Sequence, residues 1–278
     1  MRFTKYQGIG NDFVMFADPD DALELTPQLV RGLCDRRFGI GADGVIRVVP
    51  GGGDFDVFMD YANSDGSIGE MCGNGIRCLA LFAADQGMVD GREISVGTRA
   101  GVKSVTIQRD GQVTVDMGPP VFDPPSIPVV WPGSDALHAK IELDDEIIEA
   151  ACLSMGNPHA VVFVDDPAAV PVATLGPVIE RHALFPKGAN VDFVRVESPG
   201  RIVMSVWERG SGQTLACGTG ACAGAVAARI LRKTNARLIV ALPGGELDVE
   251  WAGSIDETAS VFMTGPAVKT FEGEIDLA

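Results

Sequence analysis

The chain has 278 residues, of which 22% are charged, and a formal net charge of −16. This acidity argues against nucleic acids and anionic membranes as partners, because a phosphate surface is bound by clustered Lys and Arg. No segment approaches the ~18 apolar residues of a membrane helix, the N-terminus lacks the apolar core of a signal peptide, and six cysteines are too few for a disulfide framework. We therefore expect a cytoplasmic protein with reduced thiols.

In the first half of the chain, short β-branched segments bounded by Gly or Pro predict strands. Thr26 is expected to cap a helix that begins at Pro27 and ends near Arg37. A second helix is expected over 73–86, and because nearly all of its faces are apolar or small, we expect it to be buried. The predicted strands cover 13–18, 44–50, 55–61, 103–109 and 112–118.

Six prolines between Pro119 and Pro132 predict a linker or an irregular strand. The second half then resembles the first: helices are expected over 172–182 and 218–233, and strands over 160–166, 191–197, 202–208, 237–243 and 257–265. The last segment, 268–278, alternates apolar and polar residues and predicts one more strand. Its pattern does not say with which half it pairs.

The two halves are related by an internal repeat. Four separated blocks recur in the same order at an offset of 145 to 148 residues, with boundaries near Gly118-Pro119 and Gly265-Pro266. The alignment places Asn11 opposite Asn157, Asn63 opposite Glu208, and Cys72 opposite Cys217. Matches in register over four blocks are best explained by duplication. We expect two similar domains, each with a sheet wrapped around one central helix.

The repeated cysteine motifs are MCGNGIRC (71–78) and ACGTGACA (216–223), each at the start of a predicted buried helix. A helix N-terminus lowers the pKa of a thiol and can hold a carboxylate on its backbone amides. If the halves face each other across a cleft, their thiols approach one carbon from opposite sides. One could then remove a proton and the other return it, which inverts the configuration. The motifs thus predict a two-base racemase or epimerase of a small amino acid.

Other interpretations of the cysteines are weaker. A lone cysteine is most often a small core residue, and we expect this of Cys34, Cys78, Cys152 and Cys222. The spacings in the two motifs do not fit a zinc site, and no C-x-x-C pair marks a redox disulfide. A non-catalytic thiol protein, acting as a redox sensor or a binding module, remains the alternative from another class.

Polar residues inside the repeated blocks are candidate ligands for a zwitterionic amino acid: Asn11, Asn63, Asn74, Asn157 and Asn190. Glu208 could hold an ammonium group and Arg209 a carboxylate. His159 is a candidate base. No dinucleotide, P-loop or pyridoxal phosphate signature is evident, so no cofactor and no metal are expected.

The motifs together resemble the diaminopimelate epimerase family. GIGNDFV, ANSDGS, MCGNGIRC, GNPHAV, GANVDFV and WERGSGQTLACGTGACA carry the resemblance along the whole chain. It implies an isomerase that converts LL-2,6-diaminopimelate to the meso form without pyridoxal phosphate, in lysine and peptidoglycan biosynthesis. It also implies a homodimer of pseudo-symmetric α/β (α+β) domains, each a mixed, mostly antiparallel sheet or barrel around a central helix, with the active site in the cleft between them. The C-terminal strand returns to the first half in this family, which gives domains of 1–118 plus 267–278 and of 119–266.

By the same resemblance, Cys72 and Cys217 are the catalytic acid–base pair, assisted by His159 and Glu208. The implied substrate-binding set is Asn11, Asn63, Gly73, Asn74, Asn157, Asn190, Glu208, Arg209, Gly218 and Thr219.

One position departs from the family pattern: some members carry a substrate-contacting Gln where this chain has Gly44, so that contact is not carried over. A proline or hydroxyproline racemase is the nearest alternative enzyme, but His would be expected where this chain has Asn74. An isomerase of the same fold without thiols is disfavoured by Cys72 and Cys217.

Overall fold

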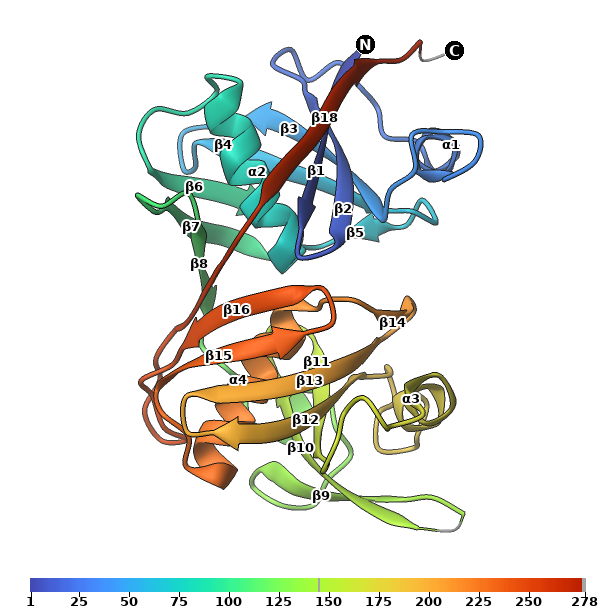
Figure 1. Cartoon of the computed structure of the whole chain (residues 1–278), viewed down its shortest axis with the longest axis vertical. Helices are drawn as coiled ribbons and strands as arrows, with labels where there is room; N and C mark the ends of the chain where they lie inside the picture. Colours follow the sequence, from blue (N-terminus) through green and yellow to red (C-terminus); the bar gives the residue numbers. More distant parts are fainter. Residues whose placement is uncertain (145, 277–278) are drawn as a thin grey trace. The chain divides into compact units, whose positions relative to one another are not determined.

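The computed structural model describes residues 1–144 and 146–276. The chain forms two compact units, which Figure 1 labels element by element. Unit 1 comprises Met1–Asp116 and the segment from Thr264 onward, and unit 2 comprises Met117–Met263. The helices are α1 (Pro27–Cys34), α2 (Gly73–Asp85), α3 (Val172–Glu180) and α4 (Gly218–Arg232), with a 3-10 turn η1 (Pro124–Ser126) in the proline-rich segment.

The strands of unit 1 are β1 (Arg2–Gly8), β2 (Asn11–Ala17), β3 (Gly44–Pro50), β4 (Val57–Asn63), β5 (Ile68–Gly69), β6 (Glu93–Thr98), β7 (Gly101–Ile107), most of β8 (Val113–Gly118), and β18 (Val268–Glu274). Those of unit 2 are β9 (Ala136–Glu142), β10 (Ile147–Ser154), β11 (Pro158–Phe163), β12 (Asn190–Ser198), β13 (Arg201–Glu208), β14 (Gly212–Thr214), β15 (Arg237–Leu242), β16 (Gly245–Glu250) and most of β17 (Val261–Gly265).

The two units pair their strands in the same sequence of directions. In unit 1 the order is β18–β1–β2–β3–β4–β6–β7, with β2/β3 and β4/β6 parallel and the other neighbours antiparallel. In unit 2 the order is β9–β10–β11–β12–β13–β15–β16, with β11/β12 and β13/β15 parallel. This correspondence confirms a duplicated fold built on a mixed, mostly antiparallel sheet.

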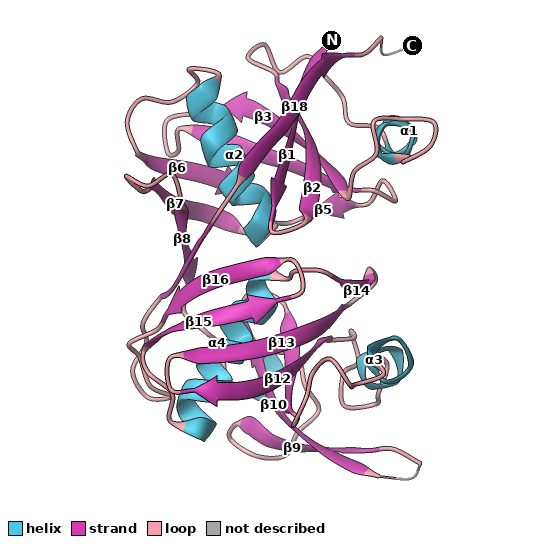
Figure 2. Ribbon diagram, viewed as in Figure 1, coloured by secondary structure: helices cyan, strands magenta, loops and turns pink. Residues whose placement is uncertain are grey.

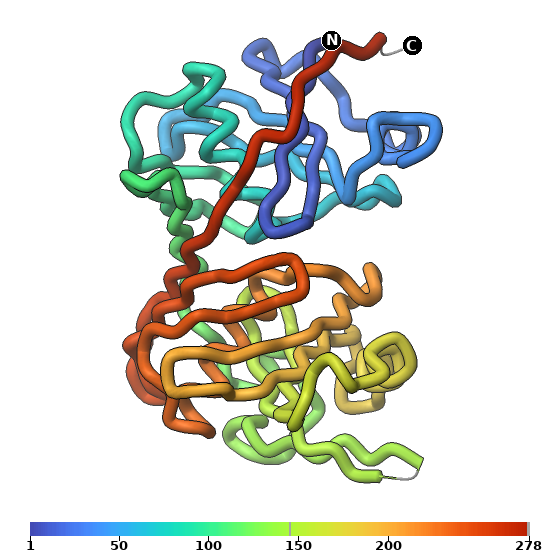
Figure 3. Tube along the Cα trace, in the orientation of Figure 1, coloured from blue at the N-terminus to red at the C-terminus, as the bar shows by residue number. Residues whose placement is uncertain are grey.

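The outermost strand beside β1 in unit 1 comes from the end of the chain. β18, the last strand, pairs antiparallel with β1, and Figure 3 shows the red C-terminal segment beside the blue N-terminal one. β9 follows β8 in the sequence but pairs with β10 of unit 2. β9, which belongs to unit 2, therefore has there the place that β18 has in unit 1. The sequence pattern alone left the partner of the last strand open.

Each unit buries one helix against its sheet, as Figure 2 shows for α2 and α4. α2 packs on β1, β2, β3, β4, β7 and β18, and α4 packs on β10, β11, β12, β13, β15 and β16. Ten of the 13 residues of α2 and ten of the 15 residues of α4 are buried, which confirms that apolar and small residues on all faces indicate a central helix. Among the described residues, no helix is long and apolar enough to cross a membrane.

The first helix starts where the sequence predicted and ends earlier. Thr26 accepts a hydrogen bond from the backbone N–H of Leu29, and Pro27 occupies the first helical position. The prediction of helix up to Arg37 was wrong, because α1 ends at Cys34. Asp35 has extended backbone angles, and its carboxylate accepts the N–H groups of Arg37 and Phe38, which would otherwise bond within the helix.

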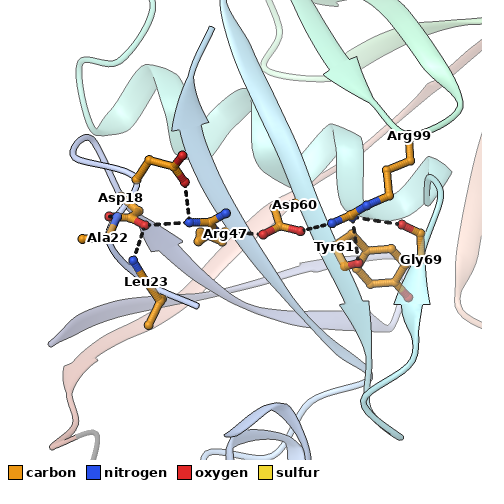
Figure 4. Close-up of polar contacts among 9 residues, drawn as sticks. Asp18, Ala22, Leu23, Arg47, Asp60, Tyr61, Gly69 and Arg99 are labelled. Atoms are coloured by element: carbon orange, nitrogen blue, oxygen red, sulfur yellow. Dashed lines mark hydrogen bonds and ion pairs between the residues drawn. The ribbon is translucent and has the colours of Figure 1, made fainter. Parts of the chain in front are cut away.

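A row of alternating charges crosses the sheet of unit 1 (Figure 4). The Arg47 guanidinium donates to Asp18 at 3.0 Å, to Asp60 at 2.8 Å and to Asp21 at 2.7 Å. Arg99 donates to the other oxygen of Asp60 at 2.5 Å, and also reaches the carbonyl oxygens of Tyr61 and Gly69. Ionic hydrogen bonds thus hold β3 to β4 and to the residues that follow β2.

Candidate active site

In unit 1 the candidate residues gather at one edge of the sheet. β2 begins at Asn11 and the parallel β3 begins at Gly44, while the antiparallel β4 ends at Asn63 opposite Gly44. The turn before Asn11 has positive φ angles at Ile9 (47°) and Gly10 (87°), the geometry of a tight hairpin. Because a β-branched residue at positive φ is a strained arrangement, the position of Asn11 is fixed at some energetic cost.

Cys72 is the N-cap of α2. Its Sγ accepts the backbone N–H of Gly75 at 3.4 Å, and its thiol lies 3.6 Å from Oδ1 of Asn11. The same Oδ1 accepts Nδ2 of Asn74 at 3.3 Å. Nδ2 of Asn11 donates to Asp43 at 2.8 Å, which fixes the direction of the amide. The structure therefore brings Asn11, Cys72 and Asn74 together, as the sequence predicted.

A fully buried arginine supports this loop from beneath. Nη1 of Arg77 donates to the Gly73 carbonyl at 3.0 Å, and Nη2 donates to Oδ1 of Asn74 at 3.0 Å. These bonds hold the two residues after Cys72 in place. The sequence does not predict this role for Arg77, because a basic residue in a helix usually faces water.

The space beside Gly44 is occupied by an aromatic ring. A Cβ at Gly44 would lie 2.7 Å from Cε2 of Tyr61, and a Cβ at Gly69 would lie 2.2 Å from Cδ1 of the same ring. The Tyr61 hydroxyl donates to Oδ1 of Asn63 at 2.5 Å, and Nδ2 of Asn63 donates to Ser67 at 3.0 Å. Gly44 is therefore where Tyr61 needs room, and Tyr61 orients Asn63.

Unit 2 repeats this edge with different side chains. Asn157 precedes β11, Asn190 begins the parallel β12, and Glu208 ends the antiparallel β13. Cys217 is the N-cap of α4, and its Sγ accepts the backbone N–H of Gly220 at 3.4 Å. The carboxylate of Glu208 thus takes the place that Asn63 has in unit 1.

The thiol of Cys217 is more strongly protonated than the sequence analysis expected. Burial raises its pKa well above the ordinary value, and the charges of Glu208 and Asp192 raise it further. Hydrogen bonds from Thr219 and the Gly220 amide act in the opposite direction but are outweighed. The expected lowering of this pKa was wrong, because only 4% of Cys217 is exposed and desolvation penalises the thiolate.

Glu208 is also shifted toward its neutral form. Burial raises its pKa, while hydrogen bonds from Thr214 and Cys217 and the nearby His159 partly oppose the shift. Arg209 is exposed, and its Nη1 donates to the Lys187 carbonyl at 3.1 Å. The structure therefore connects Glu208 with Cys217 and His159, and directs Arg209 toward the surface.

His159 and the candidate residues Asn157 and Asn190 are held by two separate sets of hydrogen bonds. Nδ1 of His159 lies 2.7 Å from Oδ2 of Asp192, and its Nε2 lies 3.0 Å from Oδ1 of Asn157. Asn190 donates to the Pro158 carbonyl at 2.9 Å and accepts the N–H of Arg209 at 3.0 Å. The sequence analysis missed Asp192, although an acidic residue inside the apolar segment VDFV was a readable signal.

The remaining thiols are core residues. Cys34, Cys78, Cys152 and Cys222 are buried, and burial raises the pKa of the first three to about 12. In the described part of the chain, no group of three or more His, Cys, Asp and Glu residues could hold a metal ion.

Solved structures with a similar fold are distant in sequence. A probable proline racemase from Agrobacterium radiobacter K84 matches with a TM-score of 0.76 and 17% identity, over 100% of this chain and 93% of that chain. A hydroxyproline epimerase from Agrobacterium vitis matches with a TM-score of 0.71 and 15% identity, over 98% and 91%. These two proteins share the duplicated fold of this chain.

Sequence relatives identify the family. The chain belongs to the diaminopimelate epimerase family, whose model matches residues 3–122 and again residues 151–270, once in each half. The diaminopimelate epimerase of Synechococcus elongatus is 47% identical over 284 residues, covering 100% of this chain and 99% of that protein. That of Alkalilimnicola ehrlichii is 46% identical over 282 residues, with 100% and 99% covered. The chain is therefore an isomerase.

Proposed function

We propose that the protein interconverts LL-2,6-diaminopimelate and meso-diaminopimelate by two-base proton transfer at Cα, as a step of lysine and peptidoglycan biosynthesis. The observation that carries this proposal is the equivalent placement of Cys72 and Cys217 as the N-caps of buried helices. The full-length identity to diaminopimelate epimerases supports the choice of substrate.

In the proposed reaction the two half-sites close on one amino acid. The Cys72 thiolate removes the Cα proton from one face, and the Cys217 thiol gives a proton to the opposite face, so the configuration inverts. The raised pKa of Cys217 supports this assignment, since a protonated thiol is the acid. The roles exchange in the reverse direction. Only acid–base chemistry of the chain is used, and no cofactor takes part.

The substrate would be held by asparagine amides, by backbone N–H groups and by the charged side chains of Glu208 and Arg209. We assign Asn11, Asn63, Asn74 and the Gly73 backbone to the half-site of unit 1. We assign Asn157, Asn190, Glu208, Arg209 and the Gly218-Thr219 backbone to the half-site of unit 2. Asn190 acts through Arg209, whose backbone it holds. His159 and Glu208 assist the thiols in exchanging protons.

We further propose the duplicated halves, residues 1–118 plus 267–278 and residues 119–266, as the functional domains. A cytoplasmic homodimer is proposed on the family resemblance, and light scattering during size-exclusion chromatography tests the dimer.

The deciding experiment is proton NMR of LL-diaminopimelate with the reduced protein in D₂O. Loss of the α-proton signal and appearance of the meso isomer are expected. Cys72→Ala and Cys217→Ala should each slow the α-proton exchange and the formation of the meso isomer by about 10²- to 10⁴-fold. Cys222→Ala is the matched control, because Cys222 is a buried thiol of the same helix as Cys217.

Absence of exchange with reduced wild-type protein would overturn the assignment of the substrate. Proline and hydroxyproline would then be tested under the same conditions. Exchange that survives either catalytic substitution would overturn the two-thiol mechanism.

A further inference from the structure

Unit 2 contains a fully buried histidine–carboxylate pair on neighbouring parallel strands. His159 lies on β11 and Asp192 on β12, and both side chains are 0% exposed. Nδ1 of His159 and Oδ2 of Asp192 are 2.7 Å apart. Among the described residues, no hydrogen-bond donor pairs with the second oxygen, Oδ1 of Asp192. Such a carboxylate is costly to bury, because the hydrogen bonds that it loses to water are only partly replaced by hydrogen bonds within the protein.

The positions of unit 1 that correspond to His159 and Asp192 show which residues the duplicated fold accepts there. Phe13 pairs with Gly44 in unit 1, and His159 pairs with Asn190 in unit 2, so Phe13 corresponds to His159. Two residues further along the second strand of each pair, Ile46 corresponds to Asp192. A Cβ on Gly75 would lie 2.9 Å from Cδ1 of Ile46. A Cβ on Gly220, the corresponding glycine, would lie 2.4 Å from Oδ1 of Asp192.

The same site beneath the first helical turn is therefore apolar in one unit and ionisable in the other. Since Phe13 and Ile46 pack this position in unit 1, the duplicated fold does not need a buried histidine–carboxylate pair. Replacing such a pair by apolar residues is often neutral or stabilising. The polar pair of unit 2 must then serve the chemistry of its half-site.

We infer that Asp192 is a positioning residue that fixes the ring of His159 and its tautomer, an inference that rests on the proposed function. Nδ1 carries the proton and donates it to Asp192. Nε2 is then the nitrogen at which the ring gains and loses its second proton. Oδ1 of Asn157, 3.0 Å away, accepts a hydrogen bond from Nε2–H when that proton is present, and the Asn157 amide must turn to offer its N–H when Nε2 is bare. The ionisable groups that act on this site are Glu208, which interacts electrostatically with His159 and Asp192, and Cys217, which interacts with Glu208 and Asp192.

The test is Asp192→Asn, which keeps the size of the side chain and removes its charge. An amide offers Nδ1 either an acceptor or a donor, so the ring can adopt the other tautomer. We expect kcat/KM to fall by at least about 10-fold, mainly through kcat, because general acid–base assistance depends on the tautomer. The matched control is Glu149→Gln, which changes the exposed pair of His138 and Glu149 at 3.0 Å and should leave kcat/KM within 2-fold.

¹⁵N NMR of the histidine rings, recorded where they are neutral, separates positioning from structure. His159 of the wild type should carry its proton on Nδ1, and the Asp192→Asn protein should show the Nε2–H form or a mixture. An Nε2–H ring in the wild type, or the same Nδ1–H ring in both proteins, would overturn the inference. This readout does not depend on activity, so it decides the inference even if LL-diaminopimelate is not the substrate.

A double variant covers the case in which Asp192→Asn does not fold. His159→Phe combined with Asp192→Ile gives unit 2 the residues of unit 1. The protein should fold with a Tm no lower than that of the wild type and have kcat/KM reduced by at least about 10²-fold. An unfolded double variant would show that the fold needs the pair. A fully active double variant would show that neither the fold nor the reaction needs it. Either result would overturn the inference.

Discussion

Gly220 occupies the third residue of α4, where any side chain would meet Asp192. Because a Cβ would lie 2.4 Å from Oδ1 of a carboxylate held by His159, Gly220→Ala must displace the pair. We expect a loss of about 1–3 kcal/mol in the free energy of unfolding, as for other overpacked interiors, and reduced kcat. Urea denaturation and steady-state kinetics measure the two effects.

Gly224→Ala is the control in the same helix. A Cβ there would lie 3.3 Å from Cγ2 of Val194, which is tight but adjustable, and alanine favours the helix by about 1 kcal/mol. Its stability should stay within about 1 kcal/mol of the wild type. Equal losses in the two variants would contradict the special role of the Gly220 contact.

The reactivity of Cys217 should depend on the charge of Glu208. Burial first, and then the charges of Glu208 and Asp192, raise the pKa of this thiol. Glu208→Gln removes one of these charges, so the pKa falls and more thiolate is present at any pH below it. Iodoacetamide should therefore label Cys217 faster in the variant at pH 8–9, as followed by peptide mass spectrometry.

Glu246→Gln serves as the control for that labelling, because Glu246 lies in an exposed pair with Arg201. Unchanged or slower labelling of Cys217 in the Glu208→Gln protein would show that the carboxylate does not set the thiol pKa. The wild-type rate should still be rising above pH 9.

The sequence predicted the positions of the two motif cysteines better than their ionisation. Glycines after Cys72 and Cys217, followed by apolar runs, were enough to place both at helix starts. The direction of the Cys217 pKa was missed because it depends on how deeply β12, β13 and α4 bury the thiol. Asp192 was missed because its partner His159 lies 33 positions away in the sequence, and Arg77 because a basic residue in a helix usually faces water.

At the scale of elements, Arg47 joins the edges of three strands in unit 1. Its side chain is only 15% exposed, and those of Asp18 and Asp60 are 8% and 11% exposed. Arg47→Ala would leave two nearly buried carboxylates without this cation. We expect a loss of about 2–4 kcal/mol in the free energy of unfolding, measured by urea denaturation.

The acid stability of unit 1 gives a second readout of the same variant. Burial alone would raise the pKa of Asp18, but the amides of Leu23 and Ala22 and the Arg47 guanidinium outweigh it, so the pKa is lowered. The stability gained is present above the unfolded pKa, ~3.9, and is lost as the pH falls through the folded value. Arg47→Ala should weaken this dependence. Arg201→Ala, in an exposed ion pair, should change stability by less than about 0.5 kcal/mol.

Most predicted strands lie where the structure has them, and β3 and β13 agree closely. β1, β6, β9, β10 and β16 were not predicted, because Lys, Gln, Glu and His interrupt their apolar pattern. In β9, for example, His138 and Lys140 are exposed while Leu137, Ala139 and Ile141 are buried. Apolar and polar residues do alternate in these strands. Their charged residues, however, make the strand pattern weaker than in the apolar core strands.

At the scale of the whole molecule, the last strand determines which piece of the chain can fold alone. β1 depends on β18, and Met1 donates its N-terminal N–H to the Ile275 carbonyl at 2.6 Å. A chain of residues 264–276, a short Gly/Ser linker and residues 1–116 should therefore fold by itself. Residues 1–118 in natural order should not. Dispersed amide signals in NMR and a cooperative urea transition would identify the folded protein.

Each of these two polypeptides serves as the control for the other. If residues 1–118 fold as stably as the rearranged chain, β18 contributes little to unit 1. If neither folds, each unit depends on the other for more than one strand.

The pairing of the first strand with the last also sets an order of events during translation. Arg2 and Glu274 form an ion pair across 272 positions of sequence. At 5–20 residues per second, β1 would be made on the order of 15–50 s before its partner. Until then its outer edge has unpaired backbone groups, which are prone to join strands of other chains. The nascent polypeptide thus needs protection at its very beginning until the ribosome has released its end.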